Sequence, residues 1–260
     1  MIDDQNHLSL NKVAKITLLF WLMKVVATTL GEMLGDFFSM TLDLGYVKSL
    51  AITVVFFVIS LLVQIKVKRY YALLYWLVIV GTTTVGTEIS DLMDRTLGLG
   101  YAWGSLILFA ALLLTLYLWH KIENGIKVYP VTKPRVEVFY WTAILISNSL
   151  GTAFGDYLSD NMGFSYLQGA IITAVIILVV VLLHYYTKIN HIVLFWIAFI
   201  FTRPFGATFG DLLTKPLEKG GLNFGRGTAA MIATAVLLVI LFFSIRSEKK
   251  MQTVENKIPI

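Results

Sequence analysis

Apolar runs long enough to cross a membrane occur eight times in this chain of 260 residues. A helix needs about 20 apolar residues to cross a hydrocarbon core of roughly 30 Å. The runs lie near 13–38, 46–65, 71–94, 101–120, 137–160, 166–186, 191–213 and 226–244. Hydrophobic residues make up 57% of the chain and charged residues 14%, which is typical of a polytopic membrane protein. We therefore predict an all-α fold of eight transmembrane helices, in one membrane domain covering residues 1–260.

Basic residues are divided unequally between the two sides of the predicted bundle. Most Lys and Arg residues flank the two chain ends and the even-numbered connections. The opposite loops hold only Lys48, Arg95, Lys215, Lys219 and Arg226. The positive-inside rule then puts both termini, and a central loop over 122–136, in the cytoplasm. Because the net charge of +5 comes from these loop clusters, we expect membrane lipid as the partner and no nucleic acid.

The residue types that carry most enzyme chemistry do not form recognisable motifs in this chain. The sequence has no cysteine, and no zinc motif, catalytic triad or phosphate-binding loop is visible. Its histidines fall at predicted cytoplasmic ends without ligand spacing, at His7, His120, His184 and His191. We therefore expect no enzymatic activity and no cofactor.

A fourfold internal repeat organises the chain. Tryptophans stand at Trp21, Trp76, Trp141 and Trp196, and each is followed ten residues later by a glycine. The segments GEMLGD, GTEISD, GTAFGD and GATFGD then end at Asp36, Asp91, Asp156 and Asp211. Each unit is predicted to contain one helix, a short outer loop and one returning helix. The repeats cover about 13–66, 68–121, 133–187 and 188–246.

Four copies of a helical pair with this Gly and Asp pattern resemble the bacterial membrane-protein family known as domain of unknown function 347. The resemblance covers residues from about 13 to 246. It implies an integral protein of the bacterial cytoplasmic (inner) membrane. It implies no particular activity, so function has to be argued from the residues.

The repeat restricts how the helices can be arranged. Because each unit crosses the membrane twice, all copies enter in the same direction, and they are related by rotation about an axis along the membrane normal. The expected fold is a pseudo-fourfold bundle or a pair of four-helix halves. Small residues four apart, which allow close helix packing in lipid, occur as Gly31/Gly35, Gly86/Ser90, Gly151/Gly155 and Gly206/Gly210.

A polar stripe is predicted on the first helix of every repeat, because residues four apart share one helix face. The stripes are Lys24, Thr28, Glu32 and Asp36 in the first copy, Thr83, Thr87 and Asp91 in the second, Asn148, Thr152 and Asp156 in the third, and Arg203, Ala207 and Asp211 in the fourth. If each Trp marks the inner interface, the aspartates lie about 22 Å further along, in the outer half of the membrane. The stripes would then line one polar path. The alternative is that the aspartates cap outer loops in water.

The charges on these stripes suggest a ligand. Together with Glu88, the acids Glu32, Asp36, Asp91, Asp156 and Asp211 face only Lys24 and Arg203, a formal balance of −4. Either some acids are protonated or cations bind there. Oxygen ligands suit a hard ion such as Mg or Mn, which makes the four aspartates candidate metal ligands.

Three functions fit this pattern. The first is transport of a cation along the carboxylate-lined axis, with proton exchange as the coupling. The second is a proton-coupled carrier of a small organic solute, which Arg203 and Asn148 would contact. The third is a membrane scaffold in which the pattern only packs helices. Lys24 and Arg203 each have two interpretations: each neutralises a neighbouring acid, as Lys24 would neutralise Glu32, or each holds and releases a carboxylate as ions move. Pro204 makes the seventh helix a candidate for a broken helix.

Overall fold

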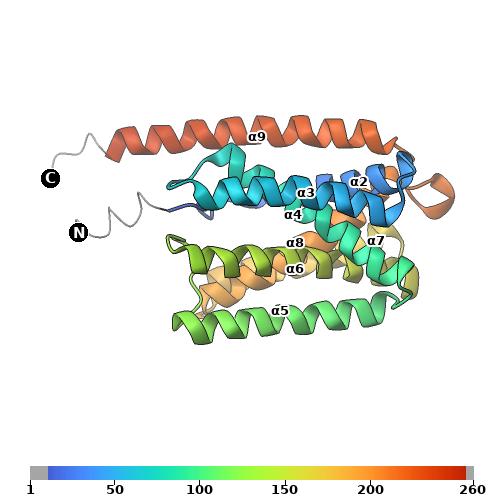
Figure 1. The fold of residues 1–260 in the computed structure, drawn as a ribbon, viewed down its shortest axis with the longest axis horizontal. Helices are drawn as coiled ribbons and strands as arrows, with labels where there is room; N and C mark the ends of the chain where they lie inside the picture. The colour runs from blue at the N-terminus through green and yellow to red at the C-terminus, as the bar shows by residue number, and fades with distance from the viewer. Residues whose placement is uncertain (1–10, 256–260) are drawn as a thin grey trace.

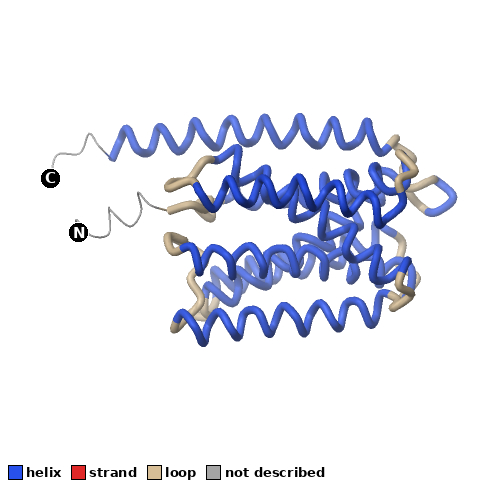
Figure 2. The backbone as a smooth tube through the Cα atoms, viewed as in Figure 1, coloured by secondary structure: helices blue, strands red, loops and turns tan. Residues whose placement is uncertain are grey.

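The computed structural model describes residues 11–255, and it is all-helical over that range (Figures 1 and 2). The long helices are α2 (Leu18–Asp36), α3 (Gly45–Lys66), α4 (Ala72–Asp91), α5 (Tyr101–Glu123), α6 (Pro134–Asp156), α7 (Tyr166–Tyr186), α8 (His191–Thr214) and α9 (Arg226–Glu255). Figure 2 shows that the loops lie at the two ends of the bundle. The predicted all-α class is therefore confirmed.

Seven of the described helices are long and apolar enough to cross a membrane. The exception is α6, whose buried face carries Ser147, Asn148 and Ser149. That face is turned into the protein, so its polarity does not require contact with lipid. The eighth crossing stays a prediction.

Four helices form an inner ring, and the other four surround it. α2, α4, α6 and α8 each pack against the next, and α8 closes the ring by packing against α2. Outside the ring, α3 packs on α4, α5 on α6, α7 on α8, and α9 on α2. Each outer helix thus covers the inner helix of the following repeat instead of its own. The result is a pseudo-fourfold arrangement in which α9, the last of the described helices, covers α2.

Glycines lie where neighbouring ring helices approach most closely. A Cβ atom added to Gly31 would meet Thr83, and one added to Gly206 would meet the side chain and backbone of Thr28. The same relation joins Gly86 to Asn148. In each case the glycine of one repeat meets a residue three positions before the glycine of the next. Small residues thus set the ring diameter, as expected for helices that pack tightly in lipid.

The second small residue of each predicted pair lies one turn further along, where the approach of the ring helices is less close. In three repeats it is a glycine whose added Cβ would come no nearer than 3.0 Å to the next ring helix. The partner is the residue directly after the glycine of the neighbouring repeat. These contacts join Gly35 to Thr87, Gly155 to Ala207 and Gly210 to Glu32.

Ser90, which has the equivalent position in the second repeat, differs from these glycines. It is fully buried, but its hydroxyl donates to Asp94 Oδ2 at 3.3 Å, one turn along its own helical segment. That Ser90 also packs helices together stays a prediction. A serine carries a hydroxyl that needs a partner when it is buried, and here that partner is a carboxylate on the same helix and not the neighbouring ring helix.

Replacing Gly206 with Ala is expected to destabilise the protein by about 1–3 kcal/mol, because the new methyl group cannot fit without moving a backbone. Unfolding in detergent, followed by circular dichroism, measures this loss. Gly225→Ala is the matched control, since its Cβ would meet only Thr228 Oγ1 at 3.7 Å. Equal stability of the two variants would contradict the close contact.

A π-helical turn follows the aspartate in the first three repeats. These turns span Phe37–Thr41, Leu92–Thr96 and Tyr157–Asn161, whereas α8 ends at Thr214 and a short 3₁₀ turn, η4 (Leu217–Lys219), follows. Extra π-helical turns are frequent at functional sites. Here the first three aspartates lie inside continuous helical segments and not in loops.

The predicted break in the seventh helix is wrong. Helix α8 runs without interruption through Pro204. The proline ring lies against Gly151 of α6, which has no side chain to displace it. Packing against the neighbouring helix therefore accommodates the residue that would otherwise disrupt the hydrogen-bond ladder.

Candidate functional site

The four repeat aspartates lie at one end of the inner ring and are linked in two pairs by basic side chains. Lys215 Nζ is 2.9 Å from Asp36 Oδ2 and 3.1 Å from Asp211 Oδ1. Arg95 binds Asp91 and Asp156, at 3.1 Å each. All four aspartates are between 1% and 4% exposed, which does not fit the alternative of caps in water. We call Asp36, Asp91, Asp156, Asp211, Arg95, Lys215 and Arg226 the outer charge cluster.

Two further features stabilise this outer charge cluster. Arg226, the first residue of α9, places its Nε 3.2 Å from Asp36 Oδ2. Burial alone would lower the pKa of Lys215, but the carboxylates of Asp211 and Asp36 raise that pKa above its ordinary value. Lys215 therefore remains a cation at neutral pH, and Asp36 is shared by two bases.

The bases of this cluster were missed by the sequence prediction, which assigned Arg95, Lys215 and Arg226 to outer loops. A signal was present in two of the repeats. Arg95 follows Asp91 by four residues and Lys215 follows Asp211 by four, while the first and third repeats carry Met40 and Asp160 at that position. When the four repeats are compared for one more helical turn after the aspartate, the second and fourth share a basic residue that the first and third lack.

Arg203 lies on the ring axis, closer to its centre than the outer charge cluster. Its Nη2 is 3.0 Å from Glu32 Oε2 and also contacts the Thr87 hydroxyl, and its Nη1 donates to the Thr28 carbonyl at 2.9 Å. The predicted pair of Lys24 with Glu32 is therefore wrong. These residues are eight positions apart on one helix, a rise of about 12 Å, which is too far for an ion pair.

Lys24 lies one turn before Thr28 on α2 and is fully buried. Its Nζ donates to Asn148 Oδ1 at 2.9 Å and lies 3.8 Å from the centre of the Phe199 ring. Asn148 in turn donates to Thr82 Oγ1 at 3.0 Å. The second cation of the axis is thus held by neutral groups.

One predicted cation-binding residue, Glu88, points away from the axis, while Thr152 of the polar path makes only a hydrogen bond within its own helix. Glu88 accepts hydrogen bonds from Ser49 and Thr53 of α3, so its carboxylate lies between α4 and α3 and not with the aspartates. The hydroxyl of Thr152 donates to the Asn148 carbonyl of its own helix at 3.4 Å. The offset of Glu88 by one residue from the stripe explains its direction, because one residue turns the helix face by about 100°.

The predicted excess of negative charge on the axis is wrong. Without Glu88, the acids Glu32, Asp36, Asp91, Asp156 and Asp211 are matched by Lys24, Arg95, Arg203, Lys215 and Arg226. In the part of the chain that the structure describes, no group of three or more His, Cys, Asp or Glu side chains could hold a metal ion. The reason for expecting a bound cation is therefore gone.

Of the histidines, His7 lies outside the described residues and the other three are exposed.

The opposite end of the axis is closed by a second set of contacts. Lys12, in the segment before α2, pairs with the buried Glu137 of α6 and donates to the Ile65 carbonyl at 2.7 Å. The hydroxyls of Tyr75 and Tyr140 lie 2.6 Å apart. We call Lys12, Glu137, Tyr75 and Tyr140 the inner closure. Three of the repeat tryptophans, Trp76, Trp141 and Trp196, are buried inside the protein. That they mark the depth of the inner membrane interface stays a prediction.

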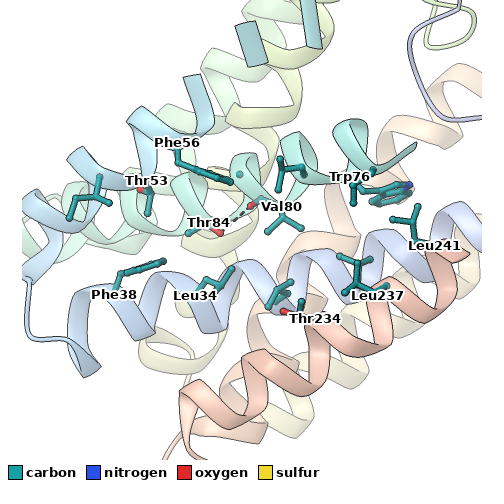
Figure 3. Close-up of a pocket in the computed structure, with 16 residues that line it drawn as sticks. Leu34, Phe38, Thr53, Phe56, Trp76, Val80, Thr84, Thr234, Leu237 and Leu241 are labelled. Atoms are coloured by element: carbon teal, nitrogen blue, oxygen red, sulfur yellow. Dashed lines mark hydrogen bonds between the residues drawn. The ribbon is translucent and has the colours of Figure 1, made fainter. Parts of the chain in front are cut away.

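Two apolar grooves lie outside the ring. One, of about 420 Å³, lies between α3 and α9 over α2 and α4, with Phe56, Trp76 and Leu237 among its lining residues (Figure 3). The other, of about 500 Å³, is lined by residues of α5, α6 and α8. Their apolar walls suit lipid chains and carry none of the axial charges.

The comparisons with known proteins identify a repeat but no activity. The family model described as Repeat of Unknown Function (DUF347) matches four consecutive segments, residues 19–70, 74–124, 139–190 and 194–250. These segments overlap the four predicted repeats. Searches of curated proteins and of solved structures found no match.

Proposed function

The chain belongs to the family built of the Repeat of Unknown Function (DUF347), and on that premise we propose that it is a proton-coupled carrier of a small solute. The carrier crosses the bacterial cytoplasmic membrane with eight helices and has both termini in the cytoplasm. Its solute moves along the axis of the inner ring, between the outer charge cluster and the inner closure. The role is transport and not catalysis.

Support comes from one observation: the buried polar contacts of the axis join one half of the ring (α2 and α4, covered by α9 and α3) to the other half (α6 and α8, covered by α5 and α7). The contacts between halves are Arg95–Asp156, Lys215–Asp36, Arg203–Glu32, Lys24–Asn148, Tyr75–Tyr140 and Lys12–Glu137. Buried ion pairs contribute little net stability, and ionisable groups within a membrane usually mark a transport path. A boundary built of such pairs suits two halves that separate and rejoin.

Protons can control that separation at the outer end. When Asp156 or Asp36 takes a proton, it no longer attracts Arg95 or Lys215, and the contact between the halves weakens. Parallel repeats related by an axis along the membrane normal are known from carriers whose halves move against each other. Because the axial charges are balanced in this closed arrangement, a cation is not needed for neutrality, and a solute other than a metal ion fits better.

Cysteine labelling tests whether the axis opens to water, and the absence of native cysteines makes the background clean. Thr152→Cys is on the axis, and Thr173→Cys on α7 is the matched control, because both threonines are fully buried and bond only to their own helix. We expect a membrane-impermeant thiol reagent to label the Thr152 variant slowly from each side and the Thr173 variant from neither. Equal protection of both variants would favour a static scaffold and overturn the proposal.

A further inference from the structure

Lys24 is a buried basic residue without a carboxylate partner. In the described part of the chain no carboxylate lies within ion-pair distance of its Nζ, which contacts only Asn148 Oδ1 and the Phe199 ring. Other bases of the axis, such as Arg203 and Lys215, each bind at least one carboxylate. Burying an ammonium group without an opposite charge is unfavourable, so an unpaired lysine at this position calls for a reason.

Arg203 provides a second cation one turn away. Lys24 and Thr28 are one turn apart on α2, and Phe199 and Arg203 are one turn apart on α8. Lys24 lies over Phe199, while Arg203 donates to the Thr28 carbonyl, so the two cations occupy successive layers of the axis. Arg203 Nε is buried and, among the described residues, has no hydrogen-bond partner. The one nearby carboxylate, Glu32, is two turns from Lys24 on the same helix.

Charge is therefore separated along the axis. The centre carries Lys24 and Arg203 against Glu32 alone, a formal excess of one positive charge. The outer charge cluster carries four aspartates against Arg95, Lys215 and Arg226, a formal excess of one negative charge. The central excess lies between the two closed ends, where a solute enclosed by both would be held.

We propose that Lys24, Arg203 and Asn148 form the binding site of a small organic monocarboxylate. This inference deepens the proposed carrier function and rests on it. Asn148 Oδ1 now holds the acceptor position at Lys24 Nζ that a carboxylate oxygen would take. The second carboxylate oxygen faces Arg203, whose guanidinium suits planar carboxylates. The solute must be small, because glycine contacts such as Gly206 with Thr28 and Gly86 with Asn148 keep the ring helices close.

Equilibrium binding tests the site without requiring transport. Acetate and propionate, added to the purified protein in detergent at constant ionic strength, are expected to raise the midpoint of thermal unfolding, whereas methylammonium is not. Lys24→Met should weaken acetate binding at least tenfold, while Lys48→Met, at an exposed lysine of the outer side, should bind as the unchanged protein does. No response to either carboxylate, or an equal response in both variants, would overturn the site.

A second variant keeps the test decisive if Lys24→Met folds poorly. Asn148→Asp places a fixed carboxylate at the acceptor position of Lys24. This variant is expected to unfold at a higher temperature than the unchanged protein in the absence of acetate, and to lose the response to acetate. A lower unfolding temperature together with a retained response would overturn the proposal. Because these are binding measurements, acetate binding combined with full protection of Thr152→Cys would reject the carrier and keep the site.

Discussion

Replacing Arg203 with Met is expected to destabilise the protein by about 3–5 kcal/mol, because it leaves the Glu32 carboxylate buried without a counter-ion. The Thr28 carbonyl and the Thr87 hydroxyl would lose their donor as well. Unfolding in detergent, followed by circular dichroism at neutral pH, measures the change in unfolding free energy.

The double variant Arg203→Met/Glu32→Gln separates the charge effect from packing. Because the second change removes the uncompensated carboxylate, most of the lost stability should return. Arg246→Met is the matched control, since Arg246 is exposed and lies over the Phe242 ring, and its loss should cost less than about 0.5 kcal/mol. Additive effects of the Arg203 and Glu32 changes would mean that the two residues are not coupled.

Removing two bases of the outer charge cluster is expected to open the outer end of the axis. In the variant Arg95→Gln/Lys215→Gln, the four aspartates would keep only Arg226, and the contacts of Asp156 and Asp36 across the two halves would weaken. In the Thr152→Cys background, labelling from the outer side should become at least tenfold faster. That factor corresponds to about 1.4 kcal/mol in the opening equilibrium.

The direction of the effect is the decisive part of this experiment. The inner closure, with Lys12 bound to Glu137, is unchanged, so the rate of labelling from the side of the inner closure should not rise. Lys48→Gln/Lys219→Gln is the control, because both lysines are exposed on the same side. An equal rise from both sides would indicate general loosening of the bundle and not the opening of one end.

The sequence predicts the helices well because their signal is local. The run expected at 166–186 is the helix Tyr166–Tyr186, and the run expected at 46–65 differs by one residue at each end from Gly45–Lys66. The first run is less accurate. The sequence predicts a start near residue 13, but α2 begins at Leu18, where the Thr17 side chain caps the helix by accepting from the Phe20 backbone N–H. In the segment before it, Lys12 pairs with Glu137.

The partners of the charged residues could not be predicted in the same way. Which base binds which aspartate depends on how the repeats are ordered around the ring and on the turn that follows each aspartate. Arg95 reaches Asp156 of the next repeat, and Lys215 reaches Asp36 of the first, a relation between residues 179 positions apart. Helical spacing alone identified the aspartates, but only the closed ring reveals that three bases bind them.

The packing of each outer helix on the inner helix of the next repeat has a consequence for how this protein is made. No repeat buries its own contact surface, so a single helical pair is not an independent folding unit. During synthesis α2 is among the first helices to form, yet its outer cover, α9, is the last. The four repeats of the protein are arranged like the subunits of a cyclic oligomer, but they are joined in one chain. It completes its interior only when α9 meets α2.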